Sequence, residues 1–418
     1  MPSGRPLAFV RSRFTYRFGW YFVVWARRGG WDCDQRLIVR KCCVCRKTRL
    51  IRSPRRRRIS LMCHWLLRLA SIGYTGDSGM VAMGPMVIAV LCALAVGGVV
   101  TRIVLSVTRR FDWLDRPNVR SAHKRPMPTA GGIGIVAGFW AGGAVAVWEG
   151  VWSGVEWWGL LGATALLLLA VIDDMVRPMR PGEKTILLLL AVAVWLGWGP
   201  HFEGLVLPGV GEVSLRWWGW PLTVLWFVFL CNAFNFMDGI DGLSALQTIC
   251  ACCWMGLIFG AIGSPVAAMT WILAGAVGGF LVFNVPPARI FMGDVGSLFI
   301  GFTIAAFGVL GTRAGLPLWV FSSILAFYFF DVCYTLTRRL LRGENILEAH
   351  RKHLYQRLGR LGWSHGRINA GAFCLTSIFG FGAYRHMEDE AGLLFFLLGG
   401  GLLIAGVVWI EMRDPEFA

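Results

Sequence analysis

The stretch VAAMTWILAGAVGGFLVFN at residues 266–284 decides the fold class. It carries no charged residue, and its length approaches the roughly 20 apolar residues that a membrane-spanning helix needs. Similar runs recur along the chain, and inside a bilayer they are expected to be helical because every backbone polar group must be paired locally. We therefore predict an all-α, polytopic helical membrane protein with about eleven spans, at residues 84–106, 131–150, 157–173, 184–200, 218–236, 243–262, 266–284, 296–312, 317–336, 369–384 and 391–410.

Composition supports this class and excludes others. Of the 418 residues, 56% are hydrophobic and 16% are charged, whereas soluble domains carry about 25% charged residues. The net charge of +17 first suggests a nucleic-acid partner. However, residues 1–80 hold 18 Lys and Arg against 3 Asp and Glu, while residues 81–418 hold 23 against 21. The basic excess belongs to one short stretch, so we predict a membrane lipid environment and no nucleic-acid partner.

The basic residues of the loops predict the orientation. The loops after the first, third, fifth, seventh and ninth predicted helices, with the C-terminus, carry 19 Lys and Arg, whereas the opposite loops carry only Arg216, Arg313 and Arg385. Positive loops favour the cytoplasmic side. We therefore expect the polar clusters of these loops to face the cytoplasm.

The N-terminal residues 1–83 form a basic, cysteine-containing extension before the transmembrane domain at 84–410 and a cytoplasmic tail at 411–418. Three explanations of the extension stay open. It is a zinc knuckle, a basic lipid-binding or regulatory tail, or the product of an upstream start that is not used, which is the explanation we prefer. The residues concerned are Cys33, Cys42, Cys43 and Cys45 for zinc, and Met80, Met83 or Met86 for the start.

Short polar residues gather at the ends of the predicted helices, and every such cluster falls on the predicted cytoplasmic side. Ionisable residues at membrane spans mark functional sites by default. Charged or capping residues with no further role remain the alternative, above all for the carboxylate pair at 173–174. The clusters contain Asp115, Asn118, Arg120 and His123; Gly131 and Gly132; Asp173, Asp174 and Lys184; Asn232, Asn235, Asp238 and Asp241; Gly293, Asp294 and Ser297; and His350, Arg351, Lys352, His353 and Arg357.

The residue types in these clusters indicate phosphoryl transfer. Carboxylates with asparagine amides are hard oxygen ligands that suit Mg²⁺ or Mn²⁺. Basic residues beside a histidine pair at i and i+3 offer donors to phosphate oxygens. Phosphoryl transfer depends mostly on positioning and on charge neutralisation, which such a set can supply.

The strings Asn232-x-x-Asn235-x-x-Asp238-Gly-Ile-Asp241-Gly and Phe-Met-Gly-Asp294-x-Gly-Ser, with Asp173-Asp174, resemble the polyprenyl-phosphate N-acetylhexosamine-1-phosphate transferases, or glycosyltransferase family four. The resemblance covers about residues 86–368. The histidine loop at 349–358 is similar to that of the branch that initiates O-antigen and other surface polysaccharides. One departure is Leu188, where many relatives have Gln, which puts the placement of Lys184 in question.

The resemblance implies a substrate pair, a cofactor and residue roles. A UDP-N-acetyl sugar would give its HexNAc-1-phosphate to undecaprenyl phosphate, with release of UMP and with Mg²⁺ as cofactor. A homodimer and a location in the bacterial cytoplasmic (inner) membrane are also implied. The implied roles are catalysis for Asp173 and Asp174; metal binding for Asp294 and Asn235; and substrate binding for Lys184, Asn232, Asp238, Asp241, His350, Arg351 and His353.

A different class of function stays open beside the transferase. A polyprenyl-linked sugar flippase or lipid-phosphate transporter would also use basic residues beside a lipid groove. Transporters, however, usually place ionisable residues near the midplane and often contain repeated halves. Here the carboxylates fall at helix ends, which favours the transferase, and metal-dependent release of UMP would discriminate the two.

Overall fold

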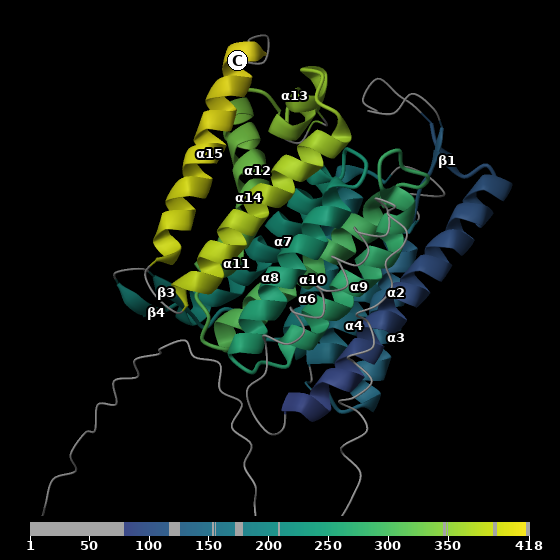
Figure 1. Cartoon of the computed structure of the whole chain (residues 1–418), viewed down its shortest axis with the longest axis vertical. Helices are drawn as coiled ribbons and strands as arrows, with labels where there is room; N and C mark the ends of the chain where they lie inside the picture. Colours follow the sequence, from purple (N-terminus) through teal and green to yellow (C-terminus); the bar gives the residue numbers. More distant parts are fainter. Residues whose placement is uncertain are drawn as a thin grey trace, which may run out of the picture. The chain divides into compact units, whose positions relative to one another are not determined.

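The computed structural model describes residues 79–116, 126–152, 154, 156–171, 179–207, 210–345, 348, 350–387 and 391–414. These residues are almost entirely helical, as the apolar runs predict (Figure 1). The helices are α2 (Gly79–Arg110), α3 (Gly132–Trp148), α4 (Glu156–Leu167) with η2 (Leu168–Ala170), α6 (Pro181–Trp198), η3 (Arg216–Trp218), α7 (Gly219–Met237), α8 (Leu243–Ala261), α9 (Val266–Asn284), α10 (Gly293–Arg313), α11 (Leu318–Ile324), α12 (Ala326–Leu341), α13 (Leu354–Arg360), α14 (His365–His386) and α15 (Gly392–Arg413).

The protein is a polytopic helical membrane protein. Seven helices of the described residues are long and apolar enough to cross a membrane, or eight if α11 and α12 count as one span. The expectation of eleven spans is not confirmed, although helix is found in all eleven predicted segments. The helix α3 and the segment Glu156–Ala170 are shorter apolar helices, and α14 carries Arg367, Asn369 and Arg385, which lower its hydropathy.

Two short hairpins connect helices at opposite ends of the helical bundle. The strands β1 (Leu114–Asp115) and β2 (Met127–Pro128) are antiparallel, with Leu114 opposite Pro128. The strands β3 (Gly204–Leu207) and β4 (Gly211–Ser214) are also antiparallel, with Gly204 opposite Ser214. In Figure 1, β1, α13 and the C-terminus lie at one end of the bundle, and β3 and β4 lie at the other.

Small residues allow α2 to pack closely on α3 and α9. A Cβ atom added to Gly138 of α3 would lie 2.5 Å from the carbonyl oxygen of Ala93, and one added to Gly279 of α9 would lie 2.4 Å from that of Leu94. Backbone approach of this kind is a common basis of helix association in membranes, where apolar burial gives little driving force.

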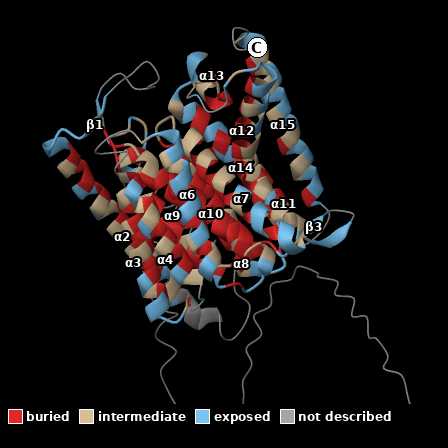
Figure 2. Cartoon of the chain, turned by 180° about the vertical axis from the view of Figure 1, so that it is seen from behind, coloured by how far each residue is buried: buried red, intermediate tan, exposed pale blue. Residues whose placement is uncertain are grey.

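The helix α10 lies at the centre of this bundle. Of its apolar window, 94% is buried inside the protein, against 28% for α2 and 17% for α15. The buried residues in Figure 2 accordingly concentrate along α10 and the helices next to it. The first turn of α10 carries Asp294, so this candidate site residue is attached to the most buried helix among the candidate spans.

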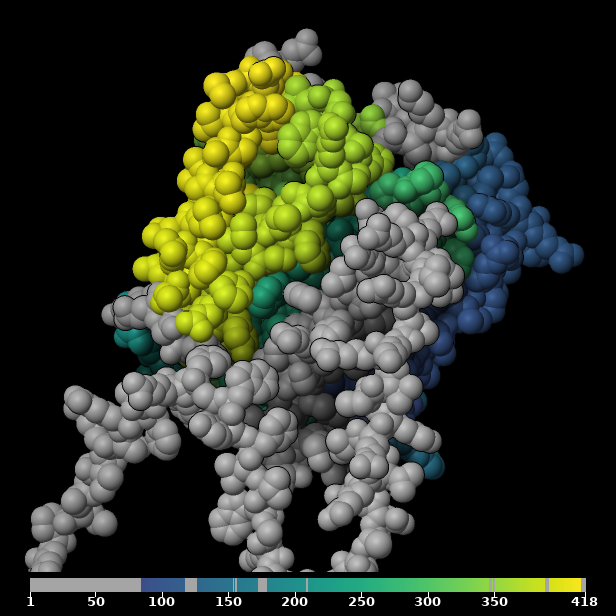
Figure 3. Space-filling model, viewed as in Figure 1, coloured from purple at the N-terminus to yellow at the C-terminus, as the bar shows by residue number. Residues whose placement is uncertain are grey.

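The predicted span at 317–336 is broken. The helix α11 ends at Ile324 and α12 continues from Ala326 at an angle of 82°. The helix α12 then runs on to Leu341, so Arg338 and Arg339 are helical rather than part of a loop. Beyond α13, the helices α14 and α15 form a pair on one face, drawn in yellow-green and yellow in Figure 3, with Gly392 packed against Gly382.

Candidate active site

The ends of α6, α7 and α10 bring three predicted site residues together. The ammonium Nζ of Lys184 lies 2.5 Å from Oδ2 of Asp294. The amide Nδ2 of Asn235 donates to Oδ1 of Asp294 at 2.8 Å and to Oγ of Ser297 at 3.1 Å. The side chains of Lys184 and Asp294 are 34% and 16% exposed. The result is a partly open group of one carboxylate, one ammonium, one amide and one hydroxyl, which we call the Asp294 cluster.

Glycines hold the backbone around this cluster. Gly131 and Gly132 donate their N–H groups to the carbonyl oxygens of Phe291 and Met292, at 2.9 and 2.8 Å. A Cβ atom on Gly132 would lie 2.2 Å from the backbone of Gly296, so α3 and α10 meet where no side chain fits. Gly293 has φ +73°, a conformation that glycine adopts without strain, directly before Asp294.

The turn after α7 joins the loop after α9 through Asp241 and Asn284. The Asp241 carboxylate accepts a hydrogen bond from the N–H of Ala288 at 3.1 Å and lies 3.4 Å from Nδ1 of His365. Burial alone would raise the Asp241 pKa, but these hydrogen bonds together lower it. Asn284 accepts from the N–H of Gly242 and donates to the carbonyl of Ile290. Asp241 therefore fixes the backbone beside the Asp294 cluster.

The histidine loop before α13 is anchored by a buried carboxylate, Asp331 of α12. This carboxylate pairs with Nδ1 of His353 at 2.9 Å and accepts the N–H groups of Leu354 and Tyr355, both at 3.0 Å. It is 1% exposed. A buried carboxylate with several donors is fully satisfied, so Asp331 sets the orientation of the His353 ring and the start of α13.

The helix α13 also contacts the turn after α7. The hydroxyl of Tyr355 donates to the carbonyl of Phe236 at 2.8 Å, and a Cβ on Gly239 would lie 2.1 Å from that hydroxyl. Phe236 also packs near the ring of His353, with centroids 5.8 Å apart. The residues Asp238 and His353, 115 positions apart in the sequence, therefore belong to one region.

His350 and Arg351 differ from His353 in their surroundings. The ring of His350 stacks on that of His353 with centroids 4.9 Å apart. Burial, with the nearby His353 and Arg339, lowers the His350 pKa to about 4, so the ring is neutral at pH 7. Nη2 of Arg351 is buried and makes no hydrogen bond within the part of the chain that the structure describes. Arg351 is thus a cation with spare donor capacity.

The remaining predicted site residues are placed less tightly. Asn232 donates to the carbonyl of Val228, one turn earlier in α7. Asp238 ends α7, with its N–H donating to the carbonyl of Asn235. Asp173 and Asp174 lie outside the described residues, as do residues 1–78 of the N-terminal extension; the catalytic assignment therefore stays a prediction.

The sequence contained a signal for Asp331 that the motif analysis did not use. It is the single acidic residue within the apolar run at 317–336, and a charge inside such a run is expensive unless it is paired or functional. Tyr355 and His365 carried no comparable signal, because each acts through a partner more than 100 positions away.

The donors of the Asp294 cluster suit Mg²⁺. Mg²⁺ usually takes one or two carboxylates together with water and substrate phosphates. The Asp294 carboxylate and the Ser297 hydroxyl place two hard oxygen donors at one position, where both accept from Nδ2 of Asn235. The oxygen of that amide would join them only with the side-chain amide turned over. Among the described residues no group of three or more His, Cys, Asp or Glu could hold a metal.

Comparisons with known proteins agree with this geometry. Residues 157–312 match the family model described as glycosyl transferase family 4. That segment contains Lys184, Asn235 and Asp294 and ends before the histidine loop.

Curated relatives extend the match over most of the chain. A probable undecaprenyl-phosphate N-acetylglucosaminyl 1-phosphate transferase of Bacillus subtilis (strain 168) is 29% identical, over 75% of this chain and 88% of the relative. A phospho-N-acetylmuramoyl-pentapeptide-transferase of Pelotomaculum thermopropionicum is 31% identical over 71% and 96%. A decaprenyl-phosphate N-acetylglucosaminephosphotransferase of Mycobacterium tuberculosis is 28% identical over 81% and 91%. The chain belongs to glycosyl transferase family 4, the polyprenyl-phosphate N-acetylhexosamine-1-phosphate transferases.

Proposed function

We propose that the protein transfers HexNAc-1-phosphate from a UDP-N-acetyl sugar to undecaprenyl phosphate, giving a polyprenyl-pyrophosphoryl sugar and UMP. The Asp294 cluster is the observation that carries this proposal, because it concentrates a carboxylate and an ammonium at the meeting point of three helices. Relatives named for this type of transfer cover most of the chain.

In the proposed reaction an oxygen of the acceptor phosphate attacks the β-phosphorus of the UDP-sugar. A new P–O bond forms, the bond to the UMP oxygen breaks, and UMP leaves with that electron pair. One phosphoanhydride replaces another, so the chain must chiefly align two anionic substrates and screen their repulsion. We assign the orientation of the acceptor phosphate to Asp173 and Asp174.

Lys184 and Asp294 have different electrostatic roles in this proposal. The ammonium of Lys184 is one third exposed and can move from Asp294 to a phosphate oxygen. Mg²⁺ bound at Asp294, Asn235 and Ser297 would neutralise negative charge on the pyrophosphate. Asn235 keeps the Asp294 carboxylate oriented through its hydrogen bond to Oδ1, and the same amide nitrogen also donates to Oγ of Ser297.

The histidine loop supplies the contacts for the sugar nucleotide. Arg351 has one guanidinium nitrogen without a hydrogen-bond partner among the described residues, and a guanidinium binds phosphate through paired N–H groups. His350 is neutral at pH 7 because its pKa is lowered to about 4; it therefore acts as a hydrogen-bonding partner and not as a cation. We propose that Asn232, Asp238 and His353 shape the same pocket.

The remaining assignments follow the sequence. We place the site on the cytoplasmic side of the inner membrane, because the loops of that end are the basic ones. The similarity of the histidine loop favours the initiation of O-antigen or another surface polysaccharide over peptidoglycan synthesis. A homodimer is part of the same proposal.

A direct assay tests the proposed function. Purified protein in detergent is incubated with undecaprenyl phosphate, Mg²⁺ and a panel of UDP-N-acetyl sugars, and UMP is measured. We expect UMP release with one sugar of the panel, dependent on both the lipid and the divalent cation. Full activity in EDTA would contradict the metal assignment. Movement of a lipid-linked sugar across vesicles without any UMP would instead favour the flippase.

A further inference from the structure

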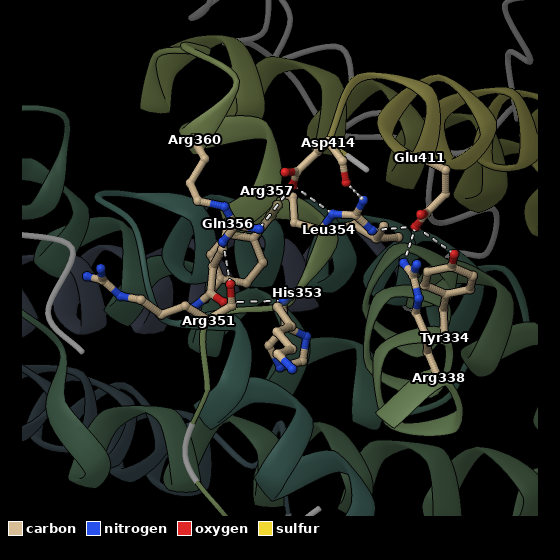
Figure 4. A network of polar contacts seen from close by, with 12 residues as sticks. Tyr334, Arg338, Arg351, His353, Leu354, Gln356, Arg357, Arg360, Glu411 and Asp414 are labelled. Carbon is tan, nitrogen blue, oxygen red and sulfur yellow. Dashed lines mark hydrogen bonds and ion pairs between the residues drawn. The ribbon is translucent and has the colours of Figure 1, made fainter. Parts of the chain in front are cut away.

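The C-terminal end of α15 is tied to α13 by a network of ion pairs. Arg357 of α13 uses its whole guanidinium there (Figure 4). Its Nε pairs with the Asp414 carboxylate at 3.0 Å, its Nη2 donates to the Asp414 carbonyl at 3.0 Å, and its Nη1 pairs with Glu411. The Arg357 side chain is 1% exposed. A buried charge of this kind is stable only while it is paired.

The same two acidic residues collect further partners. Glu411 also binds Arg338 of α12 and accepts the hydroxyl of Tyr334 at 2.8 Å, and Asp414 also binds Arg360 at 3.1 Å. Three arginines therefore converge on the end of α15. Cations are favoured at a helix C-terminus because the helix dipole is negative there. The dipole of α15 and its two carboxylates therefore both attract the arginines.

Arg360 connects this network to the histidine loop. While one of its nitrogens pairs with Asp414, Nη1 donates to the backbone carbonyl of Arg351 at 2.5 Å. Figure 4 shows the Arg351 side chain pointing away from the network. The end of α15 thus holds the backbone of Arg351 and leaves its guanidinium for another partner.

We propose that Glu411 and Asp414 are positioning residues for the sugar-nucleotide contact of Arg351. The proposal rests on the proposed function. Asp414 holds Arg360, Arg360 holds the carbonyl of Arg351, and the loop thereby presents Arg351 in one position before substrate arrives. Preorganisation of a binding group strengthens binding without a new contact. The end of α15, which the sequence alone assigned to a cytoplasmic tail, is then part of the substrate site.

The test compares Asp414→Asn, Asp414→Glu, Arg360→Gln and the double variant Asp414→Asn/Arg360→Gln in the UMP-release assay. Arg413→Gln is the matched control, because Arg413 precedes Asp414 and its guanidinium lies over the ring of Trp409, away from the network. We expect Asp414→Asn to raise KM for the UDP-sugar about tenfold, with little change in kcat or in KM for the lipid. Asp414→Glu should restore KM, and the double variant should resemble the single ones.

Hydrogen exchange of residues 351–361 gives a readout that does not depend on turnover. Asp414→Asn should lower protection there, and Arg413→Gln should not. A wild-type KM in Asp414→Asn, or equal loss of kcat and of affinity for both substrates, would overturn the positioning role. Wild-type protein that releases no UMP from any UDP-sugar would overturn the proposed function instead, so the two failures are distinguishable.

Discussion

The Asp294 cluster and the histidine loop are both polar regions at one end of the bundle, yet they use their charges differently. Lys184 in the Asp294 cluster is 34% exposed. Around the histidine loop, by contrast, the side chains of Arg339 and Arg357 are 5% and 1% exposed, and both form ion pairs with carboxylates of the protein itself. All three cations pair with carboxylates of the protein, so their exposure, and not the presence of a partner, separates the two regions.

The difference also shows how each region is built. The Asp294 cluster is made by side chains from three helices that meet at their ends. The histidine loop is held through its backbone: Asp331 accepts the N–H groups of Leu354 and Tyr355, and Arg339 donates to the carbonyls of Asn345 and Glu348. We infer that substitutions in the first region change chemistry, whereas those in the second change geometry.

The sharpest test of this contrast is Asp294→Ala. Removal of the carboxylate takes away the partner of both Lys184 and Asn235, and we expect UMP release to fall about 10³-fold, as for the loss of one preorganised charge-stabilising group. Thermal unfolding in detergent should change little because the site is partly open. Activity within tenfold of the wild type would remove Asp294 from the proposed mechanism.

Asp331→Ala should have its main effect on stability. The substitution leaves the His353 ring and two backbone N–H groups unpaired in a buried place. Breaking such a buried pair costs about 3 kcal/mol, measured by reversible unfolding in mixed micelles. Asp331→Asn, which keeps the shape of the side chain and one acceptor oxygen, is the matched comparison. It should lower the free energy of unfolding by less than Asp331→Ala does. Equal stability of Asp331→Ala and wild type would contradict the anchoring role.

Gly132→Ala tests the backbone contact behind the Asp294 cluster. A methyl group there would meet Gly296 at 2.2 Å, so α3 and α10 must separate, at about 2 kcal/mol for an overpacked contact. The rate of UMP release should also fall, because the displaced helix α10 carries Asp294. Gly197→Ala, in α6 with open space around it, serves as the control. The idea fails if the two alanine variants unfold and turn over alike.

The smallest expected effect concerns the pH dependence of stability. The His350 pKa is lowered from 6.5 to about 4 in the folded protein, so the unfolded chain binds this proton first as the pH falls. Stability is therefore lost between about pH 6.5 and pH 4, by about 1 kcal/mol at pH 5.5 after allowance for partial exposure. In His350→Gln the free energy of unfolding should depend less steeply on pH between pH 7 and pH 5.5 than in the wild type. The same slope in both proteins would contradict a neutral His350.

The sequence was sufficient for features that depend on local pattern. Every predicted apolar run contains helix, because run length and polarity decide that choice in a membrane. The family resemblance also placed Asn235 with Asp294, which the structure joins at 2.8 Å. The bend of 82° after Ile324 carried no recognised signal, because neither proline nor glycine stands at that point.

Contacts between distant residues could not be predicted in this way. Arg357 and Glu411 are 54 positions apart, and the spacing of residues along one helix says nothing about a partner on another. The pair Lys184 and Asp294 depends likewise on how α6 packs beside α10. A single sequence therefore indicated which residues carry chemistry more readily than which residues hold them in place.

The burial of α10 has a consequence for how the enzyme responds to its lipid surroundings. A change in bilayer thickness acts on helices that face lipid and makes them tilt or stretch the membrane around them. The helices α2, α6 and α15 are 28%, 28% and 17% buried over their apolar windows, against 94% for α10. The outer helices therefore adjust to hydrophobic mismatch, whereas α10, which carries Asp294, is shielded from it by its neighbours.

The same argument applies to α15, whose end holds α13. Because α15 faces lipid, its position should change with the thickness of the membrane. Lipids of different chain length should therefore alter the affinity for the sugar nucleotide more than the rate of transfer.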